Sequence, residues 1–219
     1  MKIDRRAFVV GAPLALAGCA TEPGGFGGLG YGSMYGSVSG EPFPVPAIDT
    51  SQINPRLLRR EVTYKSRERP GTIVVDPRER YAYYLLGNDK AIRYGVGVGR
   101  EEAFNFRGTA IIGNKAEWPR WTPTPAMIQH EPKRYGPYAG GMNGGPDNPL
   151  GPRALYLYRD GRDTYYRLHG TTEPYTIGTM VSSGCIRFMN QDIIDLYKRT
   201  PVGTKVVVLP IQGGAREVS

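Results

Sequence analysis

From residue 71 onward, short apolar and β-branched runs alternate with turn residues along the chain. Each run is four to seven residues long and stops at a turn signal such as Asp76-Pro77 or Gly87-Asn88, which favours strands over helices. The pattern contains no internal repeat and is typical of a mostly-β domain. Strands are predicted at 72–75, 81–86, 92–98, 109–112, 154–159, 163–169 and 204–209.

One tight-turn signal links two of these strands. Asp160-Gly161 separates the runs at 154–159 and 163–169 and predicts an antiparallel hairpin. The second strand of that hairpin ends at His169, which places an imidazole at a strand end.

Residues 190–200 show helical spacing instead. Asn190 is predicted to cap this helix, and Asp192 lies in the first turn, where negative charge is favoured. Pro201 and Gly203 end the helix. The sequence therefore predicts the all-β class, mostly β with one or two short helices. The apolar face of the helix consists of Ile193, Ile194, Leu196 and Tyr197.

Residues 114–153 depart from the strand pattern because they are rich in proline, glycine, tryptophan and asparagine. They are predicted to form a long loop, and loops of that length in compact domains are usually functional. Trp118, Trp121 and Tyr138 either pack on the sheet or line a substrate groove.

The first eighteen residues have the organisation of an export signal. Arg5-Arg6 precedes an apolar run at 7–17 that is too short to span a bilayer core. The arginine pair resembles a twin-arginine signal, although Sec signals also carry arginines. Leu16–Cys19 resembles a bacterial lipobox, so we expect residues 1–18 to be removed as a signal peptide and Cys19 to be lipidated. The alternative is an ordinary secretory signal with a chance cysteine.

The remaining chain divides into four parts by composition. Residues 19–46 are rich in glycine and proline and are predicted to be a flexible tether. Residues 47–70 mix basic and acidic side chains, which favours a solvated lead-in segment over a basic arm for nucleic acid. The folded domain is predicted at 71–210, followed by a C-terminal tail at 211–219.

Composition narrows the choice of fold and chemistry. Glycine (30) and proline (19) are frequent enough among 219 residues to argue against a helical bundle. Two cysteines and two histidines nearly exclude a disulfide scaffold and a multi-histidine metal cage. We therefore predict neither a metal nor a cofactor. One of the histidines, His130, is predicted to be an exposed loop residue.

The charge balance bears on the partner. The net charge is +8, and removing the signal takes away three basic residues and one acidic residue, which leaves +6. Such a charge suits nucleic acid, an anionic membrane surface or an acidic polymer. Because an exported protein rarely meets nucleic acid, we expect carboxylate-rich cell wall or an anionic leaflet as the partner. We expect the protein to be a monomer.

The strongest candidate for chemistry is Cys185, within the stretch Ser182–Arg187. The plainer alternative is a buried structural cysteine. Gly184 allows close approach of the backbone, and amides of a tight turn can stabilise an oxyanion. Arg187 can lower the pKa of a nearby thiol or hold a substrate carboxylate. His169 lies sixteen residues upstream, within reach to take a proton from the thiol.

These residues resemble a known family. His169-Gly170-Thr171, together with the stretch Ser182–Arg187, is similar to the active-site signature of L,D-transpeptidases with the YkuD domain. The resemblance covers roughly residues 60–210 and points to a subgroup of Gram-negative, alphaproteobacteria-like envelopes. It implies a YkuD-like β-sandwich catalytic domain at 71–210 and peptidoglycan stem peptides as substrate. Further similar landmarks lie at 71–76, 95–100, 118–123, 148–151 and 203–206.

The resemblance also implies roles for individual residues. Cys185 would be the nucleophile, and His169 would accept and return the proton. The common family pattern has a histidine directly before Gly-Cys, whereas this chain has Ser183, which leaves His169 as the main base. The residues implied to shape the oxyanion site are Gly184, Ser183 and Gly170, and those implied to bind substrate are Arg187, Thr171 and Trp121.

The implied reaction forms 3–3 cross-links between stem peptides through a cysteine acyl-enzyme, at the periplasmic face of a bacterial membrane. With water as acceptor the activity would be an L,D-carboxypeptidase, and with a protein amine it would attach envelope proteins to the wall. A different class, a non-catalytic wall-binding lipoprotein, stays open. Because Cys19 is assigned to lipid and Cys185 to catalysis, no disulfide is predicted.

Overall fold

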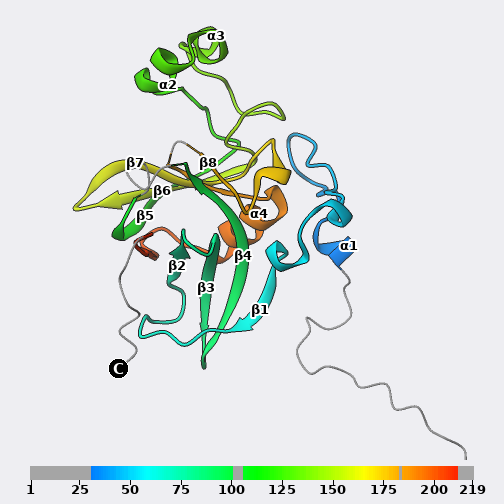
Figure 1. Ribbon diagram of the computed structural model, residues 1–219, viewed down its shortest axis with the longest axis vertical. Coiled ribbons are helices and arrows are strands. Elements are labelled where there is room, and N and C mark those ends of the chain that lie inside the picture. Colours follow the sequence, from blue (N-terminus) through cyan, green and yellow to red (C-terminus); the bar gives the residue numbers. More distant parts are fainter. Residues whose placement is uncertain (1–30, 101–105, 183, 212–219) are drawn as a thin grey trace, which may run out of the picture.

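The computed structural model describes residues 31–100, 106–182 and 184–211, and their strands form one sheet with short helices around it (Figure 1). The signal peptide, Cys19 and most of the predicted tail lie outside these residues. The strands are β1 (Arg60–Thr63), β2 (Ile73–Asp76), β3 (Tyr81–Gly87), β4 (Lys90–Gly99), β5 (Gly108–Glu117), β6 (Arg153–Arg159), β7 (Arg162–His169), β8 (Met180–Ser182), β9 (Ile186–Phe188) and β10 (Lys205–Val208). The α-helices are α1 (Tyr31–Met34), α2 (Pro125–His130), α3 (Pro132–Tyr135) and α4 (Asn190–Arg199), and the 3₁₀ turns are η1 (Thr50–Gln52), η2 (Pro55–Leu57), η4 (Gly136–Tyr138) and η5 (Pro174–Thr176).

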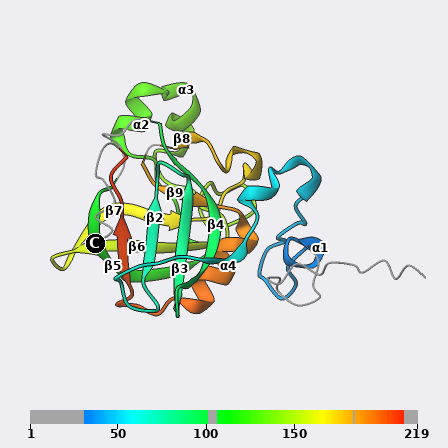
Figure 2. The ribbon, with the colours of Figure 1, turned by 60° about the horizontal axis from the view of Figure 1, so that its bottom comes forward.

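The sheet closes on itself. Its strand order is β1-β4-β3-β2-β10-β5-β6-β7-β9, and β9 pairs back onto β4, so eight strands form a barrel-like ring (Figure 2). Closure leaves the ring without free edges, while β1 and β8 add to β4 outside it. The mostly-β class predicted from the sequence is confirmed, with the expected sandwich realised as a single closed sheet.

The core of the ring is built by alternation along the strands. On β2, Ile73 and Val75 face the main cluster, and Val74 points to the other side, where a smaller cluster covers it. Strand β2 is therefore buried on both faces, which explains its continuous apolar run. Helix α4 contributes Ile193 and Leu196 to the main cluster.

The seven predicted strands correspond to β2 to β7 and β10, with shifts of a few residues at their ends. Strands β1, β8 and β9 are only three or four residues long and carried no recognisable run. The predicted helix is α4, but the predicted cap was wrong. Met189 occupies the N-cap position, and the side chain of Asn190 instead accepts a hydrogen bond from the Thr171 amide at 2.9 Å.

The long loop predicted at 114–153 differs from the structure. Strand β5 continues to Glu117 and β6 begins at Arg153, and the residues between them include α2, α3 and η4. Figure 1 shows this cover segment, residues 118–152, standing out above the sheet. Thr124 starts α2, because its Oγ1 accepts the Met127 amide at 3.2 Å.

The tether predicted over 19–46 is wrong for residues 31–46, which pack against the domain. Tyr35 is 1% exposed, and its hydroxyl accepts the Arg59 amide at 2.6 Å and donates to Asp192 at 3.1 Å. Gln191 of α4 donates to the carbonyls of Gly36 and Pro46. Composition misled the prediction because a glycine-rich segment can be ordered by polar partners supplied from elsewhere in the chain.

The lead-in segment at 47–70 is also more integrated than predicted. Residues 60–63 form β1, which pairs antiparallel with β4. Arg59 is nearly buried and forms ion pairs with Asp192 at 3.7 Å and with Asp195 at 3.1 Å on α4.

Among the helices in the described ranges, none has the length and apolar character needed to span a membrane.

A buried ion pair holds the N-terminal segment at the base of the cover segment. Glu41 Oε1 lies 2.6 Å from Nη2 of Arg153, and the two side chains are 9% and 6% exposed. Glu41 also accepts a hydrogen bond from the Trp118 indole at 2.9 Å. The start of the cover segment, the start of β6 and the N-terminal segment therefore meet at one carboxylate.

We expect Glu41→Gln to lower the free energy of unfolding by about 3 kcal/mol, because it leaves the buried Arg153 guanidinium without its buried countercharge. Urea denaturation of both proteins measures this difference in the free energy of unfolding. Glu117→Gln is the matched control, since Glu117 lies 3.8 Å from the same guanidinium but is 57% exposed. Equal effects of the two substitutions would contradict the prediction.

Candidate active site

Two neighbouring strands place the predicted catalytic residues on one face. Strands β7 and β9 run parallel, with Leu168 opposite Ile186 and His169 opposite Arg187. Leu168 and Ile186 are buried in the main cluster. Because side chains alternate along a strand, His169 and Arg187 point to the opposite face, and Cys185, one residue before Ile186, points there as well.

The turn before β9 presents Cys185. Gly184 has φ +121, a conformation that residues other than glycine rarely adopt. Ser182 Oγ accepts the Gly184 amide at 3.1 Å and donates to the Cys185 carbonyl at 2.6 Å, which ties the turn together. The Gly184 amide, expected to help hold an oxyanion, is thus engaged by Ser182. Ser183 lies outside the described residues.

His169 is set as a neutral base. It is 5% exposed, and Nδ1 lies 2.7 Å from the Gly170 carbonyl oxygen. Because a carbonyl only accepts, Nδ1 carries the hydrogen and Nε2 keeps its lone pair. Burial lowers the pKa of His169 to about 3, with the charges of Arg187 and Arg167 acting in the same direction.

The Cys185 thiol is protonated at rest. Burial raises its pKa, and this effect is opposed by the Arg167 backbone amide and by the charges of Arg167 and Arg187. Its S–H donates to the Tyr165 carbonyl, with the sulfur and oxygen 3.9 Å apart. The resting pair is therefore a thiol and a neutral imidazole, in which the proton moves only when the sulfur attacks.

A cavity of about 250 Å³ opens over these groups. On one side it is lined by His169 from β7, Arg187 from β9 and Cys185 from the turn before β9. On the other side the cover segment contributes aromatic and methionine side chains. Trp121 and Tyr138 both line this cavity. Trp118 instead packs edge-on against Phe43. The cover-segment residues that line the cavity are Trp121, Met127, Arg134, Tyr135, Tyr138, Met142, Asp147, Pro149 and Leu150.

The other predicted site residues lie at the same cavity or directly behind it. Arg187 Nη1 donates to Glu173 Oε2 at 3.1 Å. Thr171 is 3% exposed and is held through its amide by Asn190. A Cβ on Gly170 would collide with Asn190 and with Pro152, so glycine is required there.

Sequence reasoning missed three residues that shape this site. Glu173 pairs with Arg187, and Asn190 was read as a helix cap. Asn148 is fully buried, and its Nδ2 donates to the carbonyls of Pro119 and Asn143 at 3.0 Å each, so it pins the base of the cover segment. The sequence feature that could have pointed to Asn148 is its place in Asn148–Gly151, where an asparagine side chain comes directly before a proline in a turn.

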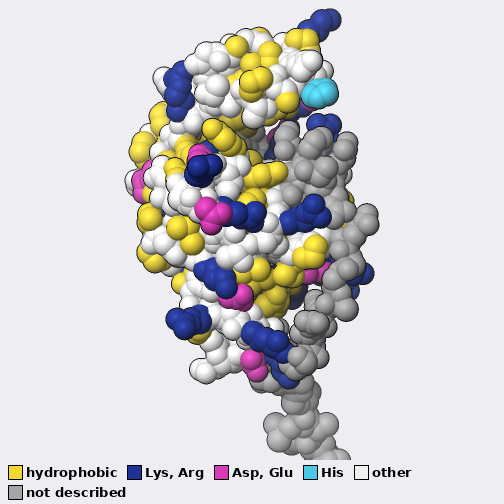
Figure 3. All heavy atoms as spheres, turned by 90° about the vertical axis from the view of Figure 1, so that its left-hand side faces the viewer, with side chains coloured by type: hydrophobic (Ala, Val, Ile, Leu, Met, Phe, Trp, Pro, Cys, Tyr) yellow, Lys and Arg dark blue, Asp and Glu magenta, His cyan; other side chains and the backbone are white. Residues whose placement is uncertain are grey.

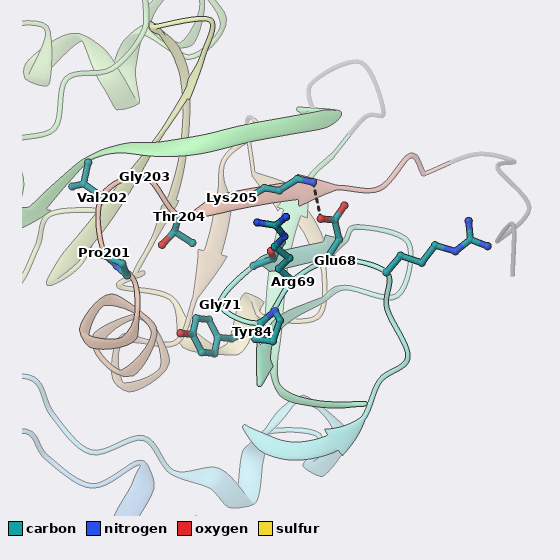
Figure 4. A pocket seen from close by; sticks show the side chains of 12 residues that line it. Glu68, Arg69, Gly71, Tyr84, Pro201, Val202, Gly203, Thr204 and Lys205 are labelled. Carbon is teal, nitrogen blue, oxygen red and sulfur yellow. Dashed lines mark hydrogen bonds and ion pairs between the residues drawn. The ribbon is translucent and has the colours of Figure 1, made fainter. Parts of the chain in front are cut away.

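A larger hollow of about 820 Å³ lies elsewhere, between residues 67–72 and 201–205. Figure 4 shows Lys205 reaching Glu68 across it, at 2.6 Å. Its lining holds neither a thiol nor an imidazole. Figure 3 shows basic side chains dispersed among acidic ones over one face of the molecule. Among the described residues, no group of three or more histidines, cysteines, aspartates or glutamates could hold a metal.

The state of His169 gives a stability prediction. An unfolded histidine binds a proton below about pH 6.5, whereas folded His169 does so only near pH 3, so acidification favours the unfolded state. Lowering the pH from 6.5 to 5 should therefore lower the free energy of unfolding by up to about 2 kcal/mol. We expect His169→Gln to remove this loss, measured as the difference between the two denaturation profiles.

The difference between the proteins isolates His169 because other groups are common to both. Burial raises the pKa of Asp192 to about 7, and that carboxyl contributes a slope of opposite sign in the same pH range. A difference profile that stays flat between pH 6.5 and 5 would show that His169 is not held neutral.

Comparison with known proteins gives one consistent family. The model of the YkuD L,D-transpeptidase catalytic domain matches residues 70–208. A probable L,D-transpeptidase of Escherichia coli strain K12, ErfK/SrfK, is 38% identical over 141 residues, covering 63% of this chain and 43% of that protein. A putative L,D-transpeptidase of Fuscovulum blasticum, from its ATP synthase subunits region, is 37% identical over 141 residues, covering 63% of this chain and 68% of that protein.

A solved structure from Brucella melitensis, described as a probable carnitine operon oxidoreductase, is 47% identical. It covers 74% of this chain and 99% of that chain, with a TM-score of 0.49. The chain spans less than half the length of the Escherichia coli relative it matches.

Proposed function

The chain belongs to the L,D-transpeptidase (YkuD) catalytic domain family, and on that premise we propose that it performs cysteine-dependent acyl transfer on peptidoglycan stem peptides. The observation that carries the proposal is the convergence of Cys185, His169 and Arg187 on one cavity, with Nε2 of the imidazole unprotonated. The L,D-transpeptidase family is enzymatic, and its substrate class suits a cavity that combines a basic group with aromatic walls.

The first half-reaction is acylation. As Cys185 Sγ attacks the carbonyl carbon of the third stem residue, its proton passes to His169 Nε2. The Gly170 carbonyl stabilises the imidazolium through Nδ1–H. The tetrahedral intermediate collapses when His169 returns this proton to the departing amine of the terminal D-residue. A thioester on Cys185 remains.

The second half-reaction decides the biological product. An acceptor amine attacks the thioester, His169 removes its proton, and the thiol is regenerated. We propose a second stem peptide as acceptor, which gives a 3–3 cross-link. Water would give an L,D-carboxypeptidase, and a protein amine would give attachment of envelope proteins to the wall. The cover segment lines this cavity, and we propose that it shapes the choice of acceptor.

Arg187 is proposed to bind a carboxylate of the donor stem. In the free protein it is paired with Glu173, whose side chain is half exposed. A substrate carboxylate would replace Glu173 at the guanidinium, whose fork of N–H groups suits a carboxylate. The proposed location is the periplasmic face of a bacterial membrane, with a lipid anchor at Cys19.

The test uses the purified chain and a disaccharide tetrapeptide from peptidoglycan. Mass spectrometry should detect loss of the terminal D-residue and formation of a 3–3 dimer. Loss of the terminal D-residue without formation of the dimer would identify an L,D-carboxypeptidase. If neither product forms and a carbapenem leaves no covalent adduct on Cys185, the non-catalytic wall-binding lipoprotein is the better description. Muropeptide analysis of a deletion strain separates cross-linking from protein attachment.

A further inference from the structure

The part of β7 before His169 carries a bulge that touches the nucleophile. Tyr156 of β6 pairs with Arg167 of β7, and Tyr158 pairs with Asp163. Two residue steps along β6 therefore correspond to four along β7, so β7 bulges between these two pairs. The extra residues include Tyr165, whose φ is +63, a left-handed conformation rare for residues other than glycine. The carbonyl of this residue accepts the Cys185 S–H.

One carboxylate holds the bulge in shape. Asp163 Oδ1 accepts the Tyr165 amide at 2.8 Å. The same carboxylate binds the Arg167 guanidinium through both oxygens, at 2.7 and 2.8 Å. That guanidinium also lies 4.3 Å from the centre of the Tyr156 ring. Asp163 therefore fixes the backbone that touches the thiol and the orientation of a neighbouring positive charge.

The register places Arg167 beside Cys185. Because Leu168 lies opposite Ile186 in the parallel pair, the residues that precede them, Arg167 and Cys185, are also neighbours across the two strands. Both side chains leave the sheet on the face away from the core. The Arg167 side chain is 15% exposed, so solvent screens its charge only partly.

We propose that Arg167, clamped by Asp163, stabilises the Cys185 thiolate directly during acyl transfer. This inference rests on the proposed function for its biological meaning. As the proton leaves the sulfur, the Tyr165 carbonyl loses its donor, and the amide and guanidinium of Arg167 become the favourable partners of the negative sulfur. No proton is exchanged with Arg167, and the proton goes to His169.

The electrostatics at the thiol agree with this role. The Arg167 amide and charge both lower the pKa of Cys185, and Asp163 raises it. The titratable and charged groups facing the thiol are Asp163, Tyr166, Arg167 and His169 from β7, Arg187 from β9, Glu173 from the loop after β7, and Arg134 and Asp147 from the cover segment. Arg167 and Asp163 therefore act on the thiol with opposite signs, which makes the proposal testable by paired substitutions.

The experiment follows the rate of Cys185 alkylation by iodoacetamide against pH in the full chain. Arg167→Met should raise the pH midpoint of thiolate formation by about half to one unit, and Arg167→Lys should restore most of it. Asp163→Asn keeps the acceptor for the Tyr165 amide, and it should lower the midpoint. Arg162→Met is the matched control on the same strand, because Arg162 is exposed, and its midpoint should equal that of the unmodified chain.

Opposite shifts in the Arg167 and Asp163 variants would support the proposal, because a general loosening of β7 would move both midpoints in one direction. Shifts of the same sign, or none, would overturn it. If Arg167→Met does not fold, the Asp163→Asn shift decides alone. Alkylation is read on the thiol itself, so the result is independent of whether the chain transfers stem peptides.

Discussion

Cys185→Ser should abolish acyl transfer to a stem peptide, with a loss on the order of 10⁴-fold or more in turnover. The hydroxyl is close in size to the thiol, but it is a far weaker nucleophile beside a neutral imidazole, and the oxygen ester would form slowly. The measurement is turnover of a disaccharide tetrapeptide by the purified chain.

A structural role for Cys185 would give a different pattern. The thiol is partly buried and donates one long hydrogen bond, so Cys185→Ser should leave the free energy of unfolding, measured by urea denaturation, within about 0.5 kcal/mol of the unmodified chain. Full activity of this variant would end the proposed mechanism. Loss of activity together with a large loss of stability would point to the buried structural cysteine instead.

His169→Gln should lower turnover on the order of 10² to 10⁴-fold, because His169 carries the one imidazole among the described residues that line the cavity. The amide retains a donor toward the Gly170 carbonyl, so the local backbone should be kept. With the low pKa of His169, turnover of the unmodified chain should also stay high well below pH 6.

The second histidine provides the control. His130 lies exposed at the end of α2, and it is absent from the lining of the cavity. We expect His130→Gln to leave turnover unchanged. A similar loss in both variants would mean that proton transfer is not centred on His169.

Much of the ring could be predicted because its strands carry their own signals. The β-branched runs that end at turn residues gave the positions of β2 to β7 and β10. The alternation of apolar and polar residues in these runs is also what buries one face of each strand in the core. Strands β8 and β9 escaped notice because three residues are too few to show a period. Their place is set by pairing with β4 and β7.

The N-terminal segment shows the opposite case. Its glycines and prolines indicate disorder, yet Tyr35 and Glu41 bind Asp192 and Arg153 more than a hundred residues away. Such pairing leaves no trace in local composition, since each partner looks like an ordinary polar residue on its own. Asn190 was misjudged for the same reason, because a capping residue and a tertiary hydrogen bond require the same side chain.

The strand pattern and the two residue types proposed for acyl transfer, Cys185 and His169, could be read from the chain, because propensity and chemical reactivity belong to the residues. The arrangement of these residues depends on the fold. The parallel register of β7 and β9 brings them to one face, burial and nearby arginines keep the imidazole neutral, and the β7 bulge turns a carbonyl onto the thiol. Register, burial and pKa arise from groups distant in the chain, so they exist only after folding.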